Sequence, residues 1–438
     1  MRRVVIGFGW IALYLAAVIA PLVFAVAHDA PPARGFVHDL SIALGFVGLA
    51  MLGLQFAVTA RIRRVAAPYG IDVVIQFHRQ ISYVAVLFVL AHPALLVFTD
   101  APMAELLNPF SAPWRARFAL TAVAALLTLV VTAAWRRRLR ISYERWRIVH
   151  GVLAVAVLAL SLLHVQLVGY YVAQPWKQVL WAAMSIAVVG LLLHVRVVRP
   201  LQLLRHPYVV TEVQPRAGDT YSVVLRPDGH PGLRFRPGQF AWLSVGSNPF
   251  AIEQHPFSFS SSADVPDRLE LTIKALGDFS AAIGEIEPGT RAYLDGPYGV
   301  FTTDLHEAAS FVFVAGGIGV TPVMSMLRTH ADRGDHRPML LVYGITTMED
   351  ATFAAELEEL TERLDLRVVY VPAEPPPGWD GPSGFVDREL LDRELPSDRE
   401  HLQCFLCGPD PMTAAVEQAL HDLGVEPDHV NYERFAFV

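Results

Sequence analysis

Six long apolar stretches without a charged residue dominate the N-terminal half of this 438-residue sequence. Each has at least 18 residues, and an apolar helix of about 20 residues spans the hydrocarbon core of a bilayer. The sequence therefore predicts an all-α membrane bundle of six spanning helices, the first of them retained rather than cleaved as a signal peptide. The stretches are 4–27, 40–60, 80–99, 118–135, 148–176 and 178–195.

Positive charge between these stretches is one-sided. If the N-terminus lies inside, the cytoplasmic segments hold 15 Lys and Arg residues, and the outer segments hold only Arg34, Arg115, Arg117 and Lys177. Cytoplasmic segments of membrane proteins carry the excess of Lys and Arg. The sequence thus predicts a multi-pass protein of the inner cell membrane whose N- and C-termini are both cytoplasmic.

Four histidines on the third and fifth predicted helices form two pairs with one spacing. His78 and His92 are 14 residues apart, and so are His150 and His164. Fourteen helical residues turn to within about 40° of four full turns and rise about 21 Å, so both members of a pair share a helix face. Because these two helices run in the same direction, we expect His78 opposite His150 at an inner level and His92 opposite His164 at an outer level.

Two facing histidine pairs at two depths suit two stacked haems, each held by one histidine from either helix. No Cys-x-x-Cys-His motif occurs, so these would be non-covalent, b-type haems. Zinc is the alternative metal, but it takes four ligands at one point, whereas these four histidines are split between two levels. His194 has no partner at this spacing, and we expect it to bond to a neighbouring helix; His28 and His38 are expected to be solvated.

The second half of the chain differs in charge and in periodicity. Residues 1–205 carry 19 Lys and Arg against six Asp and Glu, whereas the remainder carries 16 against 36. The basic residues do not cluster on the soluble part, so no nucleic-acid partner is expected. Short alternating strands to about residue 303 predict an antiparallel barrel, and strands alternating with helices then predict a parallel, doubly wound sheet. We expect domains at 1–203, 204–305 and 306–438.

The first strand of the predicted parallel sheet runs into Ala-Gly-Gly-Ile-Gly-Val-Thr-Pro at 315–322, followed by a helix. Glycines permit a tight turn, and the N–H groups at the start of a helix can cradle a pyrophosphate. A close strand-to-helix crossing would use the same residues. The spacing is not Gly-x-Gly-x-x-Gly, so the common dehydrogenase fingerprint does not apply.

Further motifs follow in order along the soluble half. They are His-Pro-Phe-Ser-Phe-Ser at 255–260, Ile-Lys-Ala-Leu-Gly-Asp-Phe-Ser at 273–280, Gly-Pro-Tyr-Gly at 296–299, the glycine turn at 315–322 and Cys-Gly-Pro-Asp-Pro-Met at 407–412. Their order resembles that of ferredoxin-NADP reductase-like flavoproteins. The version beginning His-Pro-Phe, fused to six helices with paired histidines, resembles the ferric reductase and NADPH oxidase superfamily over nearly the whole chain. The resemblance implies a haem-binding bundle, an FAD-binding barrel domain and an NAD(P)H-binding α/β domain.

The resemblance also assigns roles to single residues. The residues implied to contact the flavin are His255, Pro256, Phe257 and Ser258, and those implied to hold its phosphates are Lys274, Gly277 and Ser280. A cation and a hydroxyl beside a glycine turn suit a diphosphate. The residues implied to bind the dinucleotide pyrophosphate are Gly316, Gly317, Gly319 and Thr321, and those implied to approach the nicotinamide are Cys407, Gly408 and Pro409.

The cysteines and the last aromatic residues complete the candidate site. Cys404 and Cys407 also form Cys-x-x-Cys, which is typical of a redox dithiol or half a zinc site, but there is no second pair and the motif ends a strand. Cys404 is therefore expected to be a buried residue of the hydrophobic core. In similar flavoproteins a terminal aromatic stacks on the flavin, which makes Phe437 the candidate and Phe435 the alternative; a plain edge-strand aromatic also fits.

The resemblance implies an NAD(P)H oxidase or ferric-reductase-type oxidoreductase. Electrons would pass from cytoplasmic NAD(P)H through FAD and two b-type haems to an acceptor on the outer side. Dioxygen, giving superoxide, is favoured because the outer loops are short; ferric iron or its chelates and a periplasmic protein partner are the alternatives. The segment 343–350 lacks the Arg that would suit the 2'-phosphate of NADPH, so NADH and NADPH are both candidates for the electron donor.

Overall fold

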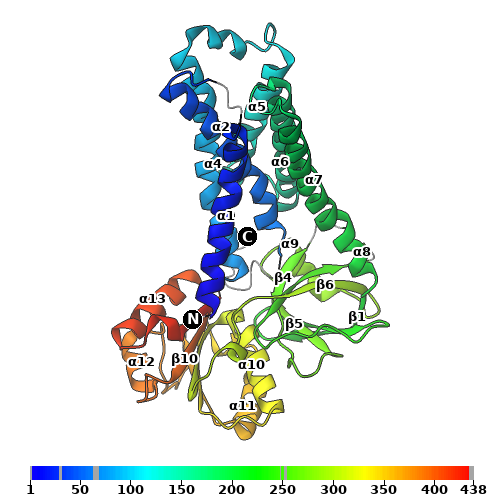
Figure 1. The fold of residues 1–438 in the computed structure, drawn as a ribbon. Coiled ribbons are helices and arrows are strands. Elements are labelled where there is room, and N and C mark those ends of the chain that lie inside the picture. The colour runs from blue at the N-terminus through cyan, green and yellow to red at the C-terminus, as the bar shows by residue number, and fades with distance from the viewer. Residues whose placement is uncertain (1, 29–31, 63–68, 247, 251–253, 434–438) are drawn as a thin grey trace. The chain divides into compact units, whose positions relative to one another are not determined.

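The computed structural model of the chain describes residues 2–28, 32–62, 69–246, 248–250 and 254–433 (Figure 1). The polypeptide forms two compact units, Met1–Arg199 and Pro200–Val438. In the described residues the first unit is helical, and the second combines strands and helices around cores of its own.

The first unit is built from long helices, and six helices among the described residues are long and apolar enough to cross a membrane. Their bounds are α1 Arg2–Val26, α2 Phe36–Thr59, α4 Ile71–Thr99, α5 Trp114–Ala134, α6 Tyr143–Val168 and α7 Pro175–Leu193. A 3-10 helix, η1 (Ala101–Leu107), joins α4 to α5, and α7 continues through a π-helical turn, η2 (His194–Val198), into α8 (Arg199–Leu204). The prediction of six spanning helices is confirmed.

The outward surface of these helices is apolar. Phe8 is 67% exposed, Leu87 64%, Val152 63% and Ile186 69%. In water, exposed apolar surface is unfavourable by about 25 cal/mol for each Å². Lipid tails remove that cost, so the surface is that of a multi-pass membrane protein.

The most extensive helix contacts in this unit are those of α2 with α4 and of α5 with α6. Gly48 on α2 lets two backbones approach, because a Cβ there would lie 2.8 Å from Cγ2 and 3.2 Å from the backbone nitrogen of Val89 on α4. Small residues permit such close packing of membrane helices. The helices α4 and α6 are less closely packed and meet through side-chain rings.

A buried lysine joins the start of α7 to the end of α1. Lys177 is 2% exposed, and its Nζ donates a hydrogen bond of 2.8 Å to the carbonyl oxygen of Ala25. The last carbonyls of a helix lack partners within the helix and carry the negative end of its dipole, so an ammonium group stabilises them. Lys177, predicted in an outer loop, therefore caps a neighbouring helix.

The second unit begins with a six-stranded antiparallel sheet, here called the barrel lobe (208–298). Its strands are β1 Tyr208–Arg216, β2 Thr220–Pro227, β3 Phe240–Val245, β4 His255–Ser258, β5 Leu269–Lys274 and β6 Arg291–Tyr298, in the order β4-β3-β6-β1-β2-β5. An isolated β-bridge from Phe259, just after β4, to Leu271 on β5 closes the sheet into a barrel. Apolar side chains such as Val223, Leu225 and Leu271 fill its interior. The predicted antiparallel barrel is confirmed.

The rest of the second unit is a five-stranded parallel sheet, here called the sheet lobe (310–433). Its strands are β7 Ser310–Gly316, β8 Met339–Ile345, β9 Leu366–Pro372, β10 Leu402–Cys407 and β11 Val430–Glu433, in the order β11-β10-β7-β8-β9. One face is covered by α10 (Val320–Asp332) and α11 (Ala354–Arg363), the other by α12 (Arg388–Glu394) and α13 (Asp410–Asp422). The predicted doubly wound sheet is confirmed. Its strand order reverses between β7 and β10, and ligands of such sheets bind beyond the carboxyl ends of the strands at that point.

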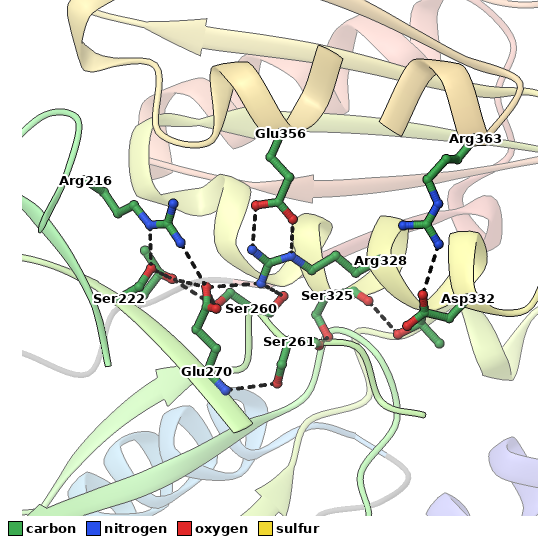
Figure 2. A network of polar contacts seen from close by, with 12 residues as sticks. Arg216, Ser222, Ser260, Ser261, Glu270, Ser325, Arg328, Asp332, Glu356 and Arg363 are labelled. Atoms are coloured by element: carbon green, nitrogen blue, oxygen red, sulfur yellow. Dashed lines mark hydrogen bonds and ion pairs between the residues drawn. The ribbon is translucent and has the colours of Figure 1, made fainter. Parts of the chain in front are cut away.

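One face of α10 fastens the sheet lobe to the barrel lobe (Figure 2). Thr321, Ser325 and Arg328, at positions i, i+4 and i+7, each donate a hydrogen bond to a backbone carbonyl oxygen of the barrel lobe. Arg328 also lies between two carboxylates: its Nη1 is 3.1 Å from Oε1 of Glu270 on β5, and its Nε is 2.6 Å from Oε1 of Glu356 on α11. The two lobes are therefore joined through a mostly buried cation.

Candidate functional site

The two histidines predicted at the inner level face each other from α4 and α6. The ring centroids of His78 and His150 are 6.5 Å apart, with the ring planes at 69°. Two imidazoles that share one metal ion need about 6 Å between centroids, because each metal–nitrogen bond is about 2 Å and each ring adds about 1 Å. This spacing fits one metal ion held between the two rings.

Three of the four histidines direct Nδ1 at a carbonyl oxygen, namely His78, His164 and His92. Nδ1 of His78 is 2.6 Å from Oε1 of Gln55 on α2, and Nδ1 of His164 is 2.8 Å from the backbone oxygen of Arg115 on α5. A backbone carbonyl oxygen can only accept, so Nδ1 carries the proton in His164; in His78 it does so with the Gln55 carboxamide as it is oriented here, Oε1 toward the ring. Nε2 then keeps its lone pair, which is the state that a metal ligand needs.

The ring of His92 packs against one turn of α2. Its Nδ1 is 3.0 Å from the backbone oxygen of Ser41, and the hydroxyl of Ser41 donates to the backbone oxygen of His92 at 2.7 Å. Four residues along, Gly45 leaves room for the ring, because a Cβ there would lie 3.1 Å from Nδ1 of His92. His92 is also within electrostatic reach of His164, its predicted partner.

Polar atoms without partners gather round the inner pair. In the part of the chain that the structure describes, Nδ1 of His150, Nε2 of Gln55 and Nε1 of Trp146 are buried and have no hydrogen-bond partner. Such a buried group costs about 1–3 kcal/mol. A cation lies close by, since Nη2 of Arg196 would be 3.6 Å from a Cβ added at Gly151. Together with the paired rings, unfilled polar groups and a cation fit a haem with its carboxylates.

The remaining membrane histidines differ from the expectations in part. His28 is exposed, as expected. His38 is not solvated, because its side chain is only 13% exposed and its Nδ1 lies 3.4 Å from Oδ1 of Asp39. His194 is exposed at the start of η2, so the bond to a neighbouring helix that we expected is not found among the described contacts.

In the barrel lobe, β4 and the short helix α9 (Asp278–Ala281) form a stack of aromatic rings. His255 stacks on Phe279 with centroids 4.2 Å apart and planes at 22°, and Phe257 lies 6.1 Å from the same ring at 16°. Pro256 stands between them on β4. Ser258 is 4% exposed, and its Oγ has no partner among the described residues. An unsatisfied hydroxyl beside flat rings fits a planar heterocycle with polar edges, such as a flavin.

The turn after β5 is held together by the hydroxyl of Ser280. Its Oγ accepts hydrogen bonds of 2.9 Å from the backbone nitrogens of Leu276 and Gly277. Lys274, at the end of β5, is half-buried. The hydroxyl expected on a flavin phosphate thus organises the start of α9, and the phosphate contacts of Lys274, Gly277 and Ser280 stay predictions.

The turns after β7 and β10 touch each other where the strand order reverses. A Cβ at Gly319 would lie 2.2 Å from the carbonyl oxygen of Cys407, and one at Gly408 would lie 3.1 Å from Cα of Gly316. Gly317 has φ +52° and open space around its Cα. The glycines therefore allow two backbones to meet, and they leave a side-chain-free surface at the start of α10, where a pyrophosphate could bind.

Two more predicted residues flank this junction. Pro409 is packed against the turn, because its Cδ would lie 2.9 Å from a Cβ at Gly316. Thr321 is 3% exposed, and its hydroxyl donates to the backbone oxygen of Thr272 at 3.4 Å. Thr321 is therefore engaged in docking the two lobes, and its contact with a pyrophosphate stays a prediction.

The two cysteines lie on opposite faces of β10, the strand between β11 and β7. Cys404 packs in the core under α12 and α13, whereas Cys407 packs in the core under α10 and α11. Both thiols are free, and opposite faces allow neither a disulfide nor two ligands on one metal. Burial raises the pKa of Cys404 to about 12, and burial followed by the Glu433 carboxylate raises the pKa of Cys407 well above 9.0. Cys407 is thus a protonated thiol at neutral pH.

A cavity of about 390 Å³ opens elsewhere, between the lobes near the C-terminal end of α10. Arg216, Arg328 and Arg363 line it, and each is paired with a carboxylate. The opposite end of α10 carries the glycine turn. The cavity therefore lies away from the predicted dinucleotide site. None of these three arginines is left unpaired to bind an anion.

Sequence reasoning missed several residues of these sites. Gln55 and Ser41 were not singled out, although they are 14 residues apart, the same spacing as the histidines that they contact. Phe279 lies within the motif at 273–280 and has no role assigned there, and Glu433 is not among the predicted residues. Phe437 and Phe435, the candidates for stacking on a flavin, lie outside the described residues.

Three family models match the chain in succession. They are the ferric reductase like transmembrane component at residues 44–161, an FAD-binding domain at 218–302 and an oxidoreductase NAD-binding domain at 313–418. The part of the six-helix unit from α2 to α6 thus matches a membrane component, and the two lobes match two parts of a flavoprotein reductase.

Curated relatives match the soluble half. The reductase component of propane 2-monooxygenase from Rhodococcus jostii is 32% identical over 234 residues, 52% of this chain and 62% of that protein. Ferredoxin–NADP reductase B from Sorangium cellulosum is 34% identical over 218 residues, 48% of this chain and 88% of that protein. The crystal structure of an Amycolatopsis cytochrome P450 reductase matches with a TM-score of 0.47 and 26% identity over 52% of this chain and 69% of that one. The chain spans less than two thirds of the monooxygenase reductase component from R. jostii.

Proposed function

Because this chain belongs to the ferric reductase-like membrane oxidoreductases with a ferredoxin-NADP reductase-like module, we propose that it moves electrons from cytoplasmic NAD(P)H across the membrane through two b-type haems. Its family takes electrons from NAD(P)H through FAD. FAD, when bound, takes a hydride from the nicotinamide and releases electrons one at a time, which haem iron can accept.

The single observation that carries the membrane part is the inner histidine pair. The rings of His78 and His150 lie 6.5 Å apart on two different helices, and Gln55 keeps the proton of His78 on Nδ1. His92 and His164 form the outer pair, and backbone oxygens hold their Nδ1 protons in the same way. Two imidazoles at each level would hold one haem iron, which would supply one-electron transfer to an acceptor that needs no open ligand position.

The soluble residues supply binding and orientation. In this proposal His255, Pro256 and Phe257 lie along the flavin and Ser258 bonds its polar edge. Lys274, Gly277 and Ser280 lie at its phosphates. The side-chain-free turn of Gly316, Gly317 and Gly319, with Thr321 beside it, receives the dinucleotide pyrophosphate. Cys407, with Gly408 and Pro409, adjoins the nicotinamide, and its raised pKa keeps the thiol neutral there. Phe437, or Phe435 as the alternative, would stack on the flavin; both lie outside the described residues.

The domain limits and the sidedness are parts of the proposal. The membrane domain comprises 1–203, the FAD domain 204–305 and the NAD(P)H domain 306–438. The excess of Lys and Arg in alternate connecting segments supports cytoplasmic N- and C-termini and insertion in the inner membrane. Segment 343–350 offers two carboxylates and no Arg or Lys to a 2'-phosphate, so either NADH or NADPH serves.

Dioxygen, reduced to superoxide, is the proposed acceptor, with ferric iron or its chelates as the second candidate. A separate periplasmic protein is the third. The short connections on the predicted outer side, η1 among them, support a small acceptor.

The first test counts haems in the purified full-length protein. We expect two haem equivalents in the unaltered chain, and one in His92→Ala and in His164→Ala, with reduction of the flavin by NAD(P)H intact in both. His38→Ala is the control, because His38 lies on α2 beside Asp39 and belongs to neither pair. Two full haem equivalents in either outer-pair variant would overturn the pairing.

The second test identifies the acceptor. Cytochrome c reduction by the haem-loaded protein is measured in air with FAD and NADH or NADPH, with and without superoxide dismutase. A large dismutase-sensitive fraction supports superoxide production. Cofactor oxidation with a small sensitive fraction supports ferric iron or its chelates instead, and no turnover by the protein alone supports a periplasmic partner.

A further inference from the structure

Helix α2 carries its own pair of polar residues, matched to the histidines of α4. Ser41 and Gln55 are 14 residues apart, as His78 and His92 are. The helices pack closely along each other and run in opposite directions, so Gln55 reaches His78 and Ser41 reaches His92. A second helix thus repeats the histidine spacing at both levels.

The two contacts differ in chemistry. His92 and His164 each give the Nδ1 proton to a backbone oxygen, at Ser41 and Arg115. His78 gives it to a side chain, the carboxamide of Gln55, over 2.6 Å. Gln55 is 8% exposed, so water does not compete freely for this bond. The hydroxyl of Ser41 also lies 3.2 Å from Nδ1 of His92, but there the backbone oxygen stays as an acceptor whatever the side chain, whereas a substitution at Gln55 removes the acceptor of His78.

We propose that Gln55 is a positioning residue for the inner haem: it fixes the ring plane and the tautomer of His78 and raises the electron density on Nε2. This inference rests on the proposed function, in which His78 ligates iron. A hydrogen bond from the far nitrogen of a ligating imidazole fixes its orientation and strengthens the ligand. A stronger axial ligand favours ferric iron, so the bond also lowers the reduction potential of the inner haem.

The test uses Gln55→Leu, which removes the acceptor, and Gln55→Glu, which keeps an oxygen acceptor in either protonation state. Thr59→Val is the matched control, because Thr59 lies one turn along α2 and, among the described contacts, its hydroxyl donates only to the backbone oxygen of Gln55. Haem transfer to apomyoglobin measures affinity, a spectroelectrochemical titration resolves the two potentials, and low-temperature electron paramagnetic resonance reports the axial ligands.

With Gln55→Leu we expect one haem to bind about 10–100-fold more weakly, to titrate at a higher potential and to show altered low-spin g values. The second haem should be unchanged. Gln55→Glu should restore affinity and the low-spin signal, and Thr59→Val should match the unaltered protein. A general packing defect would instead affect both haems, and a carboxylate would not rescue it.

A separate variant distinguishes failure of this inference from failure of the proposed function. If His78→Ala keeps two haems, the proposed ligation is wrong. If His78→Ala loses one haem but Gln55→Leu leaves the affinity, potential and spectrum of that haem unchanged, the positioning role of Gln55 is overturned while the ligation stands. If Gln55→Leu fails to fold, Gln55→Asn takes its place, because its shorter amide cannot span the same distance. A reduction potential of the inner haem in Gln55→Asn identical to that in the unaltered protein would also overturn the positioning role of Gln55.

Discussion

Arg328 of the sheet lobe lies 3.1 Å from Glu270 of the barrel lobe, measured from Nη1 to Oε1, and the carboxylate side chain is 2% exposed (Figure 2). Arg216 and Arg268 stand 3.9 and 3.5 Å from the same carboxylate. A charge this deeply buried is tolerated only with partners, so the docking of the two lobes depends on this pair.

Replacing Arg328 with Met should destabilise the soluble unit by about 3–5 kcal/mol, because it leaves the buried carboxylate of Glu270 undercompensated. For a unit of this size the midpoint of thermal unfolding should fall by about 10 °C. Release of FAD fluorescence on heating the purified protein measures it. Arg363→Met is the control: its ion pair with Asp332 is exposed and is worth about 0–1 kcal/mol. Equal midpoints for the two variants would contradict the prediction.

The same pair predicts a dependence on pH. Burial would raise the pKa of Glu270, but the charge and hydrogen bond of Arg328, with Arg216 and Ser260, outweigh it and hold the pKa below its ordinary 4.5. A carboxyl with a lowered pKa stabilises the fold above its unfolded pKa, and this stability is lost as the pH falls through the folded pKa. The unaltered protein should therefore melt above Glu270→Gln at pH 6–7, roughly, and the gap should shrink below about pH 4.5. A gap independent of pH would exclude an ionised Glu270.

Substituting Gly319 by Ala should weaken NAD(P)H binding without loss of FAD. The new Cβ would lie 2.2 Å from the carbonyl oxygen of Cys407, and backbone atoms cannot rotate away as a side chain can. Overpacking of this kind costs about 1–3 kcal/mol, which corresponds to roughly 5–150-fold in affinity. Stopped-flow titration of flavin reduction measures the dissociation constant. Gly334→Ala is the control in the same lobe: its Cβ would meet no atom within 4 Å, but φ +64° makes an Ala there strained, so it destabilises the lobe away from the glycine turn. An equal loss of affinity in both variants would point to general destabilisation.

These sites differ in how far the sequence could reveal them. Apolar length and a repeated spacing are local properties, so the six helices and the facing of His78 and His150 could be predicted from the chain alone. Strand alternation would likewise put Cys404 and Cys407 on opposite faces, because they are an odd number of residues apart. The role of Gln55 needs the axial register of α2 against α4, and the Arg328–Glu270 pair needs the docking of two lobes. Neither is encoded in any short window of sequence.

Ser258→Ala should have opposite effects on the FAD-free and FAD-bound protein. The buried Oγ has no partner among the described residues, so its removal should leave the FAD-free protein equally stable or more so. If the hydroxyl bonds the flavin, FAD affinity should fall by about 0.5–1.5 kcal/mol, or roughly 2–10-fold. Ser260→Ala is the control two residues along, because its hydroxyl donates to Glu270 and its loss should lower the melting midpoint of both forms. Unchanged FAD affinity in Ser258→Ala would remove Ser258 from the flavin site.

Gly45→Ala should disturb the outer haem and leave the inner one intact. A Cβ at Gly45 would lie 3.1 Å from Nδ1 and 3.2 Å from Cγ of His92, so the ring must tilt away and its bond to the oxygen of Ser41 must lengthen. Because that bond orients the ligand, we expect about 10–100-fold weaker binding of one haem. Gly53→Ala is the matched control on the same helix, since its Cβ would meet only Cδ1 of Leu158 at 3.8 Å, an ordinary contact. Two haems of unaltered affinity in Gly45→Ala would mean that His92 needs no fixed orientation, and the outer pair would then have to be sought elsewhere on α4 and α6.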